Sequence, residues 1–458
     1  MKIRKIKIKN YKIFDDLELD FTDSDGKALD TIVLAGINGC GKTSILQLLQ
    51  TIFSVNFNRF WNWDFLALKI DNVFCEELTI EFESSLDFIQ SFNTLLISVL
   101  NELIFSPEQH TRESNIKNIC PLLESVVSKL SNIEGKKGDI KIFSFCYKSQ
   151  KNNEKIAVSE NDFIPFGIIS ENITSQYFGA LYFVANSFEL NNDLEKKIPD
   201  EKDGIVKLVD IFSHKEEIEG YLKDSIIDAV LKNREISAQN AINKKVEEIN
   251  QILKNIKINT KLIDITSEKV IFESTNGKKI SIDDLSSGEK QLYYRAVMLS
   301  KLNIKDSFIL VDEPETSLHP TWQREIIKLY QNAGENNQVI LATHSPHIIA
   351  SVNPKNLFVL YFDEKARKIK VMNMEKEQKY TKGVEPNRIL AEIMGYKLRD
   401  EDTQNRIDEI TLLFRQSPAD IEKIEKKIEL LAYDLGLHDP AIMGINNRLL
   451  LMKRKLNQ

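Results

Sequence analysis

The sequence is poor in the residues that mark secreted and metal-centred proteins. Of its 458 residues, only 4 are Cys, 6 are His and 3 are Trp. The cysteines, at positions 40, 75, 120 and 146, have no spacing typical of metal ligands, and no histidine clusters with them. So few cysteines in so long a chain argue against a disulfide framework and indicate a reducing compartment. We therefore expect a cytoplasmic protein.

Long apolar runs are also missing. No stretch reaches the ~18 consecutive apolar residues that a membrane-spanning helix needs. The basic N-terminus continues into a strand pattern rather than into the apolar centre of a signal peptide. We therefore expect no membrane partner, which disfavours a transporter built from this chain alone.

Positive charge does not dominate the chain. The 61 Lys and Arg residues are outnumbered by 68 Asp and Glu residues, which gives a net charge of -7. A chain of this charge is not a general nucleic-acid binder, so contact with DNA requires a local basic patch. Basic residues gather in 2–12 and in 453–455. Solvated strand and helix faces explain both clusters most simply.

A glycine-rich turn lies between a strand pattern and a helix pattern. Thr31–Ala35 is a continuous apolar run, typical of a strand that is buried on both faces. The following residues 36–44 read Gly-Ile-Asn-Gly-Cys-Gly-Lys-Thr-Ser, which matches the phosphate-loop pattern in its required context. Backbone N–H groups of such a loop cradle phosphate oxygens. The predicted nucleotide-binding residues are Asn38, Gly39, Cys40, Gly41, Lys42, Thr43 and Ser44.

Two of these residues have specific predicted roles. Lys42 reaches the β and γ phosphates of ATP, and the Thr43 hydroxyl is a ligand of Mg²⁺. Cys40 is expected to be a small filler within the loop rather than a nucleophile. The alternative is a chance glycine-rich turn, which the flanking strand and helix patterns disfavour.

Acidic residues follow a second buried strand. Phe308–Asp312 is apolar up to Asp312, and Glu313 comes next. We predict that Asp312 holds Mg²⁺, directly or through water, and that Glu313 is the base or the water-orienting group for hydrolysis. A solvated acidic turn is the alternative. The strand pattern Val339–Thr343 delivers His344 to the same sheet edge, where it either contacts the γ phosphate or the attacking water, or has a structural role.

A third motif opens a helix pattern. Ser286, Ser287 and Gly288 follow Leu285, and an apolar helical face comes directly after them. Ser286 can cap this helix with Glu289 three residues on, and a helix N-terminus beside a glycine can bind an anion. Alone the motif is weak, because Ser-Ser-Gly turns are common.

The remaining patterns predict the organisation of the chain. Alternation in 5–9 and 17–21 predicts an antiparallel pair of strands, and further strands are expected at 78–82, near 139–148 and near 177–184. A hairpin is predicted at 270–282, around Asn276-Gly277. Helices are expected over 85–130 and 205–256, and three amphipathic helices over 407–456.

With its motifs in order, the chain resembles soluble ABC-type ATPases. This class includes the structural-maintenance, recombination-mediator and overcoming-lysogenization-defect proteins. The resemblance identifies Lys42 and Thr43 with Walker A, Asp312 and Glu313 with Walker B, and His344 with the switch histidine. It further identifies Ser286 and Gly288 with the signature motif, Ser317-Leu318-His319 with the D-loop, and Ile6–Lys12 with a segment that packs near the nucleotide base.

The implied fold is α/β: an ABC-ATPase-like P-loop core with a mixed sheet, a helical insertion and a C-terminal helical domain. The expected parts are the first core segment 1–84, a mainly helical insertion 85–260, the second core segment 261–375 and a helical domain 376–458. The resemblance implies ATP and Mg²⁺ as ligands, and a homodimer or higher oligomer in which the signature of one chain completes the ATP site of another.

Two departures from the wider class narrow the resemblance. Ser287 stands where many relatives have Gly. A Gln senses Mg²⁺ in the class, and Asn186 is the candidate for that role here.

Two branches of the class are disfavoured. The insertion is too short for the long coiled coil of the structural-maintenance branch, and the residues after His344 lack the Toprim nuclease carboxylates of the overcoming-lysogenization-defect branch. Residues 383–390 and 435–440 most resemble the ATPase subunit of Septu-type antiphage systems (PtuA), including retron-associated versions.

That resemblance implies a function and leaves two rivals open. In the Septu family the ATPase acts beside a separate HNH nuclease (PtuB-like), so we expect such a partner, contact with DNA through the complex, and no nuclease activity from this chain alone. The first rival is a RecF-like repair or recombination clamp that binds DNA directly. The second is a toxin-type ATPase with a nuclease in its own tail, where no His/Asp/Glu cluster has nuclease spacing.

Overall fold

The structure is a computed structural model. It describes residues 1–53, 75–85, 89–90, 128, 131–132, 135–136, 139–148, 180–184, 206–210, 215–232, 237–266, 269–302, 305–415 and 420–456. The chain divides into two units, Met1–Pro386 and Asn387–Gln458. The expected helical stretch 85–130 and the candidate Asn186 lie almost wholly outside the described residues.

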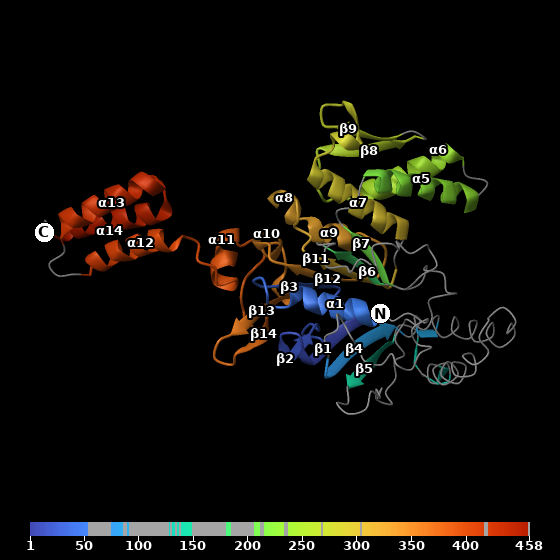
Figure 1. The fold of residues 1–458 in the computed structure, drawn as a ribbon, viewed down its shortest axis with the longest axis horizontal. Helices are drawn as coiled ribbons and strands as arrows, with labels where there is room; N and C mark the ends of the chain where they lie inside the picture. Colours follow the sequence, from blue (N-terminus) through green and yellow to red (C-terminus); the bar gives the residue numbers. More distant parts are fainter. Residues whose placement is uncertain are drawn as a thin grey trace. The chain divides into compact units, whose positions relative to one another are not determined.

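A seven-stranded sheet forms the centre of the first unit, in the order β14-β13-β3-β12-β11-β6-β7 (Figure 1). Its strands are β3 (Thr31–Ala35), β6 (Ala180–Val184), β7 (Val206–Asp210), β11 (Phe308–Asp312), β12 (Gln338–Thr343), β13 (Leu357–Asp363) and β14 (Lys368–Asn373). All neighbours are parallel except β13 and β14, so the sheet is mixed. The predicted α/β fold with a mixed sheet is confirmed.

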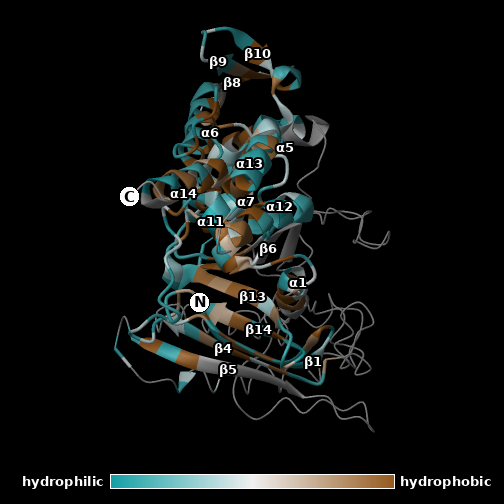
Figure 2. Ribbon diagram, turned by 90° about the vertical axis from the view of Figure 1, so that its left-hand side faces the viewer, coloured by the Kyte–Doolittle hydropathy of each residue, from teal (hydrophilic) through white to brown (hydrophobic). Residues whose placement is uncertain are grey.

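The apolar composition of the central strands accounts for their burial. Every residue of β3, β11 and β12 is buried, as expected for parallel strands that are covered on both faces. Helix α1 (Lys42–Phe53) packs against β11 and β12. The hydropathy colouring marks β13 as a largely hydrophobic strand of the same sheet (Figure 2).

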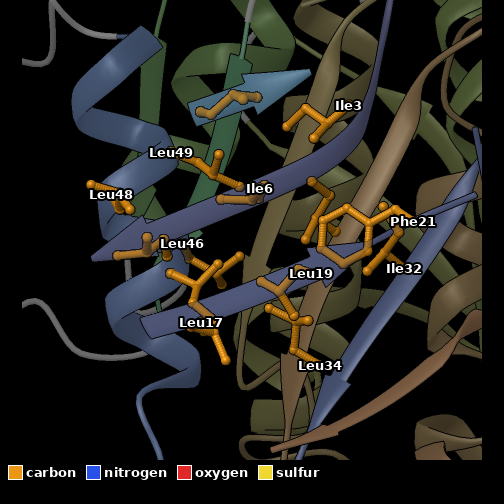
Figure 3. Close-up of a cluster of buried hydrophobic side chains, with 14 of the residues drawn as sticks. Ile3, Ile6, Leu17, Leu19, Phe21, Ile32, Leu34, Leu46, Leu48 and Leu49 are labelled. Atoms are coloured by element: carbon orange, nitrogen blue, oxygen red, sulfur yellow. The ribbon is translucent and has the colours of Figure 1, made fainter. Parts of the chain in front are cut away.

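A second, antiparallel sheet has the order β2-β1-β4-β5. It consists of β1 (Lys2–Tyr11), β2 (Phe14–Asp20), β4 (Glu77–Ser85) and β5 (Ile140–Lys148). Alternate residues of β1 and β2 are buried, so their apolar faces enter the core beside α1. Figure 3 shows Leu46 and Leu49 of α1 beside Ile6 and Leu17 of these two strands.

A buried glutamine connects the two sheets. Gln338, the first residue of β12, is fully buried. Its Nε2 donates to the carbonyls of Ile3 at 2.9 Å and Leu29 at 2.8 Å, and its Oε1 accepts from the N–H of Ile3 at 2.7 Å. One side chain thus satisfies three backbone groups that would otherwise be buried without partners.

The basic residues of β1 are engaged in ion pairs on this sheet. Arg4 pairs with Glu81 and Glu83, Lys9 with Glu77, and Lys2 with Asp30. These contacts favour the interpretation of the N-terminal basic cluster as a strand face rather than a nucleic-acid patch.

A third sheet and several helices complete the first unit. The sheet β10-β9-β8 is antiparallel, with β8 (Thr260–Ile265), β9 (Val270–Ser274) and β10 (Lys279–Ser281). The helices are α5 (Lys215–Lys232), α6 (Ala238–Ile252), α7 (Ser287–Leu302), α8 (Pro320–Gln323), α9 (Ile326–Gln331) and α10 (Pro346–Ile349), with short turns η5 (Ile282–Asp284) and η6 (Pro354–Asn356). The hairpin predicted at 270–282 is present as β9 and β10.

One secondary-structure prediction is wrong. The expected helical stretch 205–256 begins with β7, which pairs in parallel with β6. Val206 and Val209 are β-branched and favour a strand, and the open side of β6 supplies a hydrogen-bonding partner. The helices α5 and α6 occupy the rest of the stretch.

The second unit is helical. It contains α11 (Pro386–Arg388, at the boundary), η7 (Ile389–Ile393), α12 (Glu401–Leu413), α13 (Ile421–Leu435) and α14 (Pro440–Leu456). The last three are the predicted amphipathic helices, and they share an apolar core that includes Ile410, Ile424, Leu431 and Ile442. Within the described part of the chain, no helix is both long and apolar enough to cross a bilayer.

Candidate nucleotide-binding site

The phosphate loop connects β3 to α1 at the carboxyl edge of the large sheet. Gly39 and Gly41 have φ values of 84° and 86°, which favour glycine. A Cβ on Gly41 would lie 2.3 Å from Cζ of the buried Phe14, so only glycine fits against the β1–β2 hairpin. Residues 37–39 are exposed, and the backbone at the tip of the loop is therefore accessible to a ligand.

Lys42 is the first residue of α1 and is buried. Its Nζ donates to the carbonyls of Gly36 at 2.8 Å and Ile37 at 3.0 Å. The ammonium group is thereby held inside the loop. Cys40 is also buried, and its thiol donates to the carbonyl of Ile37. Burial raises the pKa of the Cys40 thiol, which disfavours the nucleophilic thiolate, in agreement with the predicted filler.

Parallel pairing brings the acidic strand end to the phosphate loop. Thr343 is opposite Ala35 and Ala342 is opposite Asp312, so β3, β12 and β11 end at one level. The Thr43 hydroxyl donates to Asp312 Oδ1 at 3.2 Å. Asp312 is buried, and desolvation is the main reason why its pKa rises to about 7. A desolvated carboxylate beside a hydroxyl is the donor set that a divalent cation would stabilise.

Three further side chains meet at the ends of β11 and β12. His344 Nδ1 lies 3.3 Å from Oε1 of Glu313 and 3.3 Å from Oε1 of Glu315. The contact with His344 lowers the pKa of Glu313, and the same contact is the main cause that raises the pKa of His344. Glu313 has a φ of 43°, an uncommon conformation that its N–H holds by donating to the carbonyl of Ala342 at 2.9 Å.

Glu315 fixes the turn that carries His344. The Glu315 carboxylate is buried, and its Oε1 accepts from the Thr343 hydroxyl at 2.7 Å and from the N–H of His344 at 2.9 Å. No sequence pattern predicted a role for Glu315. The available signal was its place in the Asp-Glu-Pro-Glu run, two residues beyond the predicted base.

The motif at 286–288 forms the start of α7. The Ser286 N–H and hydroxyl donate to Glu289 Oε2 at 3.0 and 2.8 Å, and the Glu289 N–H donates to Ser286 Oγ at 3.3 Å. This is the predicted reciprocal cap. Ser286 and Ser287 are exposed, while Gly288 is buried. A Cβ on Gly288 would lie 2.8 Å from Trp322 Cζ3 and 2.9 Å from the carbonyl of Ser317.

Comparison with known families decides the class of this site. Residues 1–349, which include the phosphate loop, the acidic strand end and His344, match the family described as AAA ATPase domain. The chain belongs to this AAA ATPase family. It is therefore an ATPase, as the sequence motifs predicted.

Named relatives of the ATPase include a retron ATPase, a Septu protein and an endonuclease. The Retron Vc95 probable ATPase of Vibrio cholerae is 23% identical over 399 residues, which cover 79% of this chain and 73% of that protein. The Septu protein PtuA of Bacillus thuringiensis is 32% identical over 185 residues, 37% of this chain and 45% of that protein. The endonuclease GajA of Bacillus cereus is 22% identical over 482 residues, 87% of this chain and 67% of that protein.

Among solved structures, the ATPase is similar to an SMC head bound to the C-terminal winged-helix domain of ScpA. The TM-score is 0.42 at 14% identity, and the match covers 83% of this chain and all (100%) of that one. The SMC head domain from Thermotoga maritima gives a TM-score of 0.39 at 12% identity, with 81% and 99% covered.

Within the ATPase, the predicted site residues fall into two groups. Lys42, Thr43, Asp312, Glu313 and His344 gather at one edge of the sheet, with Asn38–Gly41 and Ser44 in the loop and the first turn of α1. Ser286, Ser287 and Gly288 lie at the start of α7, where Gly288 is closely packed beside Ser317 of the expected D-loop and Trp322. The structure thus presents one sheet edge that gathers the phosphate loop with the acidic residues, and a capped helix start at α7.

Proposed function

We propose that this ATPase binds ATP with Mg²⁺ in a head-to-tail dimer and regulates a separate HNH nuclease in antiphage defence. The observation that carries the nucleotide part is the meeting of Thr43 with Asp312 and of Glu313 with His344 at the carboxyl ends of adjacent parallel strands. Ligand sites of open α/β sheets lie at this edge.

Each side chain then has a defined task. The Lys42 ammonium leaves the loop carbonyls for the β and γ phosphates, which offer full negative charges instead of dipoles. Thr43 and Asp312 would hold Mg²⁺, which when bound neutralises charge on the phosphates. Glu313, whose lowered pKa keeps it ionised near neutral pH, accepts a proton from the attacking water or orients it. The exposed Ile13, which approaches Gly41, offers an apolar surface beside the loop for the adenine base.

The dimer follows from the second group of residues. Ser286 and Ser287 are exposed at a helix start, where backbone N–H groups and the helix dipole favour an anion. We infer that the γ phosphate of ATP bound to a second copy occupies this start. A closed two-fold pair would then contain two composite sites.

The nuclease partner is inferred from the relatives. The match to a Septu protein and a retron ATPase supports a role in such systems, and the helices α12–α14 are the part of the chain proposed to contact the partner. Leu430, Tyr433 and Leu437 of this unit are exposed apolar residues. Contact with DNA is proposed to occur through the complex.

Co-purification tests this proposal. The ATPase is expressed with its neighbouring gene, and the expected result is a stable complex with an HNH nuclease that deletion of 403–458 abolishes. Full ATP binding by the deleted chain is the control for folding of the first unit. Absence of any nuclease from the native operon would overturn the defence proposal.

The RecF-like clamp is the second candidate. The related endonuclease GajA motivates a nuclease assay of this chain alone. A clamp predicts tight DNA binding by the purified ATPase with a steep dependence on salt. The defence proposal predicts weak binding and no cleavage without the partner.

A further inference from the structure

The amide of Gln323 connects two segments that meet at the candidate site. Gln323 is the last residue of α8 and is half-buried. Its Nε2 donates to the carbonyl of Leu318 in the expected D-loop at 2.9 Å, and its Oε1 accepts from the hydroxyl of Ser345 at 2.6 Å. Ser345 directly follows His344, so one side chain joins the D-loop to the turn that carries the histidine.

The groups around this amide allow only one orientation. A carbonyl oxygen can only accept, so the amide nitrogen has to face Leu318. The Ser345 oxygen already accepts from the N–H groups of His347 and Ile348 at the start of α10, at 3.1 and 3.3 Å, and its own proton is donated to Gln323. Leu318 and Ser345 are buried, so water is a poor substitute for either bond.

These contacts close a ring of hydrogen bonds beside the sheet edge. Glu315 Oε1 accepts from the N–H of His344 at 2.9 Å, and the Glu315 carbonyl accepts from the N–H of Leu318 at 3.0 Å. Gln323 then leads from Leu318 to Ser345. The turn of His344 is thus held before the histidine side chain by a carboxylate and after it by an amide, and both are attached to the D-loop segment.

The D-loop segment is itself tightly packed, so it can serve as a fixed base for the turn. Gly288 lies so close that an added Cβ would be 2.9 Å from the carbonyl of Ser317 and 2.8 Å from Trp322 Cζ3. The Trp322 indole donates to the carbonyl of Lys257 at 2.9 Å, which anchors α8. Gln323, the next residue, is therefore presented from an anchored element.

We propose that Gln323 is a positioning residue for hydrolysis, whose amide holds the turn of His344 against the D-loop and so maintains the His344–Glu313 contact. The proposal deepens the proposed function and rests on its assignment of the hydrolytic site. Gln323 acts through its two hydrogen bonds rather than on the nucleotide itself. Its loss should therefore impair turnover and spare ATP binding, because small misplacements of a catalytic group mainly lower the rate.

The competing explanation is that Gln323 only stabilises the fold around α8. Gln331 in α9 provides the comparison, because its Nε2 donates to the hydroxyl of the buried Thr31 at 2.8 Å. Thr31 is the first residue of β3, at the opposite end of that strand from the phosphate loop. Gln331→Met is therefore the matched control, since it removes an amide hydrogen bond far from the site.

The experiment measures kcat, KM and the ATP dissociation constant of the full-length chain, together with its thermal unfolding. We expect Gln323→Met to lower kcat by about tenfold, while the ATP dissociation constant changes less than about twofold. Gln331→Met should leave kcat within about twofold of the wild type. Gln323→Glu should also lose turnover, because it keeps an acceptor for Ser345 but sets a carboxylate oxygen against the carbonyl of Leu318.

A double variant tests whether the effect passes through the histidine. If Gln323 acts by positioning His344, Gln323→Met should lower kcat by less than about twofold further once His344→Ala has removed the imidazole. A merely structural role would give the same tenfold loss in both backgrounds.

Four outcomes would overturn the inference. These are an unchanged kcat in folded Gln323→Met, wild-type kcat in Gln323→Glu, multiplicative losses with His344→Ala, and an equal loss of kcat in Gln331→Met. If Gln323→Met fails to fold, Gln323→Glu and Ser345→Ala carry the same test, each alone and combined with His344→Ala. Failure of the proposed function looks different, since Glu313→Gln would then retain turnover.

Discussion

At the scale of single residues, the chemistry of the site depends on how a few carboxylates are placed. Sequence patterns predicted Asp312 and Glu313 as site residues, because an apolar run that ends in acidic residues can be recognised in the sequence alone. They did not identify Glu315, although it holds the N–H of His344. That role depends on the turn after β11, where Glu313 and Ser317 both adopt positive φ values of 43° and 59°. Such conformations are set by tertiary contacts and leave no local pattern.

Glu313 and Lys42 should separate catalysis from binding. Glu313→Gln keeps the size of the side chain but cannot accept a proton, so we expect ATP binding to remain and turnover to fall roughly 10²–10⁴-fold. Lys42→Ala removes the charge that meets the phosphates, so binding itself should weaken. Equilibrium binding of a fluorescent nucleotide and steady-state hydrolysis measure the two effects. Equal loss of binding in both variants would contradict the assigned roles.

His344 should give a pH-dependent contribution to stability. Its pKa is raised above 6.5, mainly by the contact with Glu313. A raised pKa means that the folded state binds the proton more tightly, so the contribution is complete below pH 6.5 and is lost as pH rises through the raised pKa. The difference in melting temperature between the wild type and His344→Gln should therefore shrink from pH 6 to pH 9.

His347 is the matched control for this measurement. Burial lowers its pKa below 6.5, so its protonation opposes folding. Replacing it by Gln should become relatively stabilising as pH falls, which is the opposite trend. Parallel trends in the two variants would indicate a general effect of pH rather than the His344 contact.

At the scale of elements, the buried parallel strands were the most predictable part. The patterns for β3 and β11 predicted strands whose bounds the structure reproduces. The patterns did not give β8, β13 or β14, and they placed β7 in a helix. These strands lie towards the sheet margins or carry Lys and Asp, so their local patterns are weak. Their conformation depends instead on hydrogen-bonding neighbours that are distant in the sequence.

Gln338 should make a large contribution to the free energy of unfolding for a single polar side chain. Gln338→Leu leaves the N–H of Ile3 and the carbonyls of Ile3 and Leu29 buried without this partner. Since each unsatisfied group costs about 1–3 kcal/mol, we expect a loss of at least about 2 kcal/mol in the free energy of unfolding. Denaturant titration measures it. The exposed Gln251 of α6 is the control, and Gln251→Leu should change stability by less than about 0.5 kcal/mol. Equal losses in both variants would refute the special role of Gln338.

At the scale of the whole molecule, the proposed dimer makes a sharp prediction about mixtures. Lys42→Ala destroys the phosphate face, and Ser286→Arg blocks the signature face. A heterodimer of the two contains one site in which both faces are intact, so random mixing of equal amounts should restore about a quarter of wild-type hydrolysis. Two differently tagged Lys42→Ala chains provide the control mixture. Activity no higher than that of either variant alone would show that each site works within one chain.

The position of β3 in the large sheet has a consequence for synthesis of the protein. Its two neighbours, β12 and β13, are made some 300 residues later, which is roughly 15–60 s at ~5–20 residues per second. A nascent chain that already contains the whole phosphate loop therefore lacks the strands that hold the loop in place. Ribosome-bound chains stalled before residue 338 should not retain ATP, and those stalled well beyond residue 373 should. Nucleotide capture would then mark the moment at which translation has delivered a folded ATPase core.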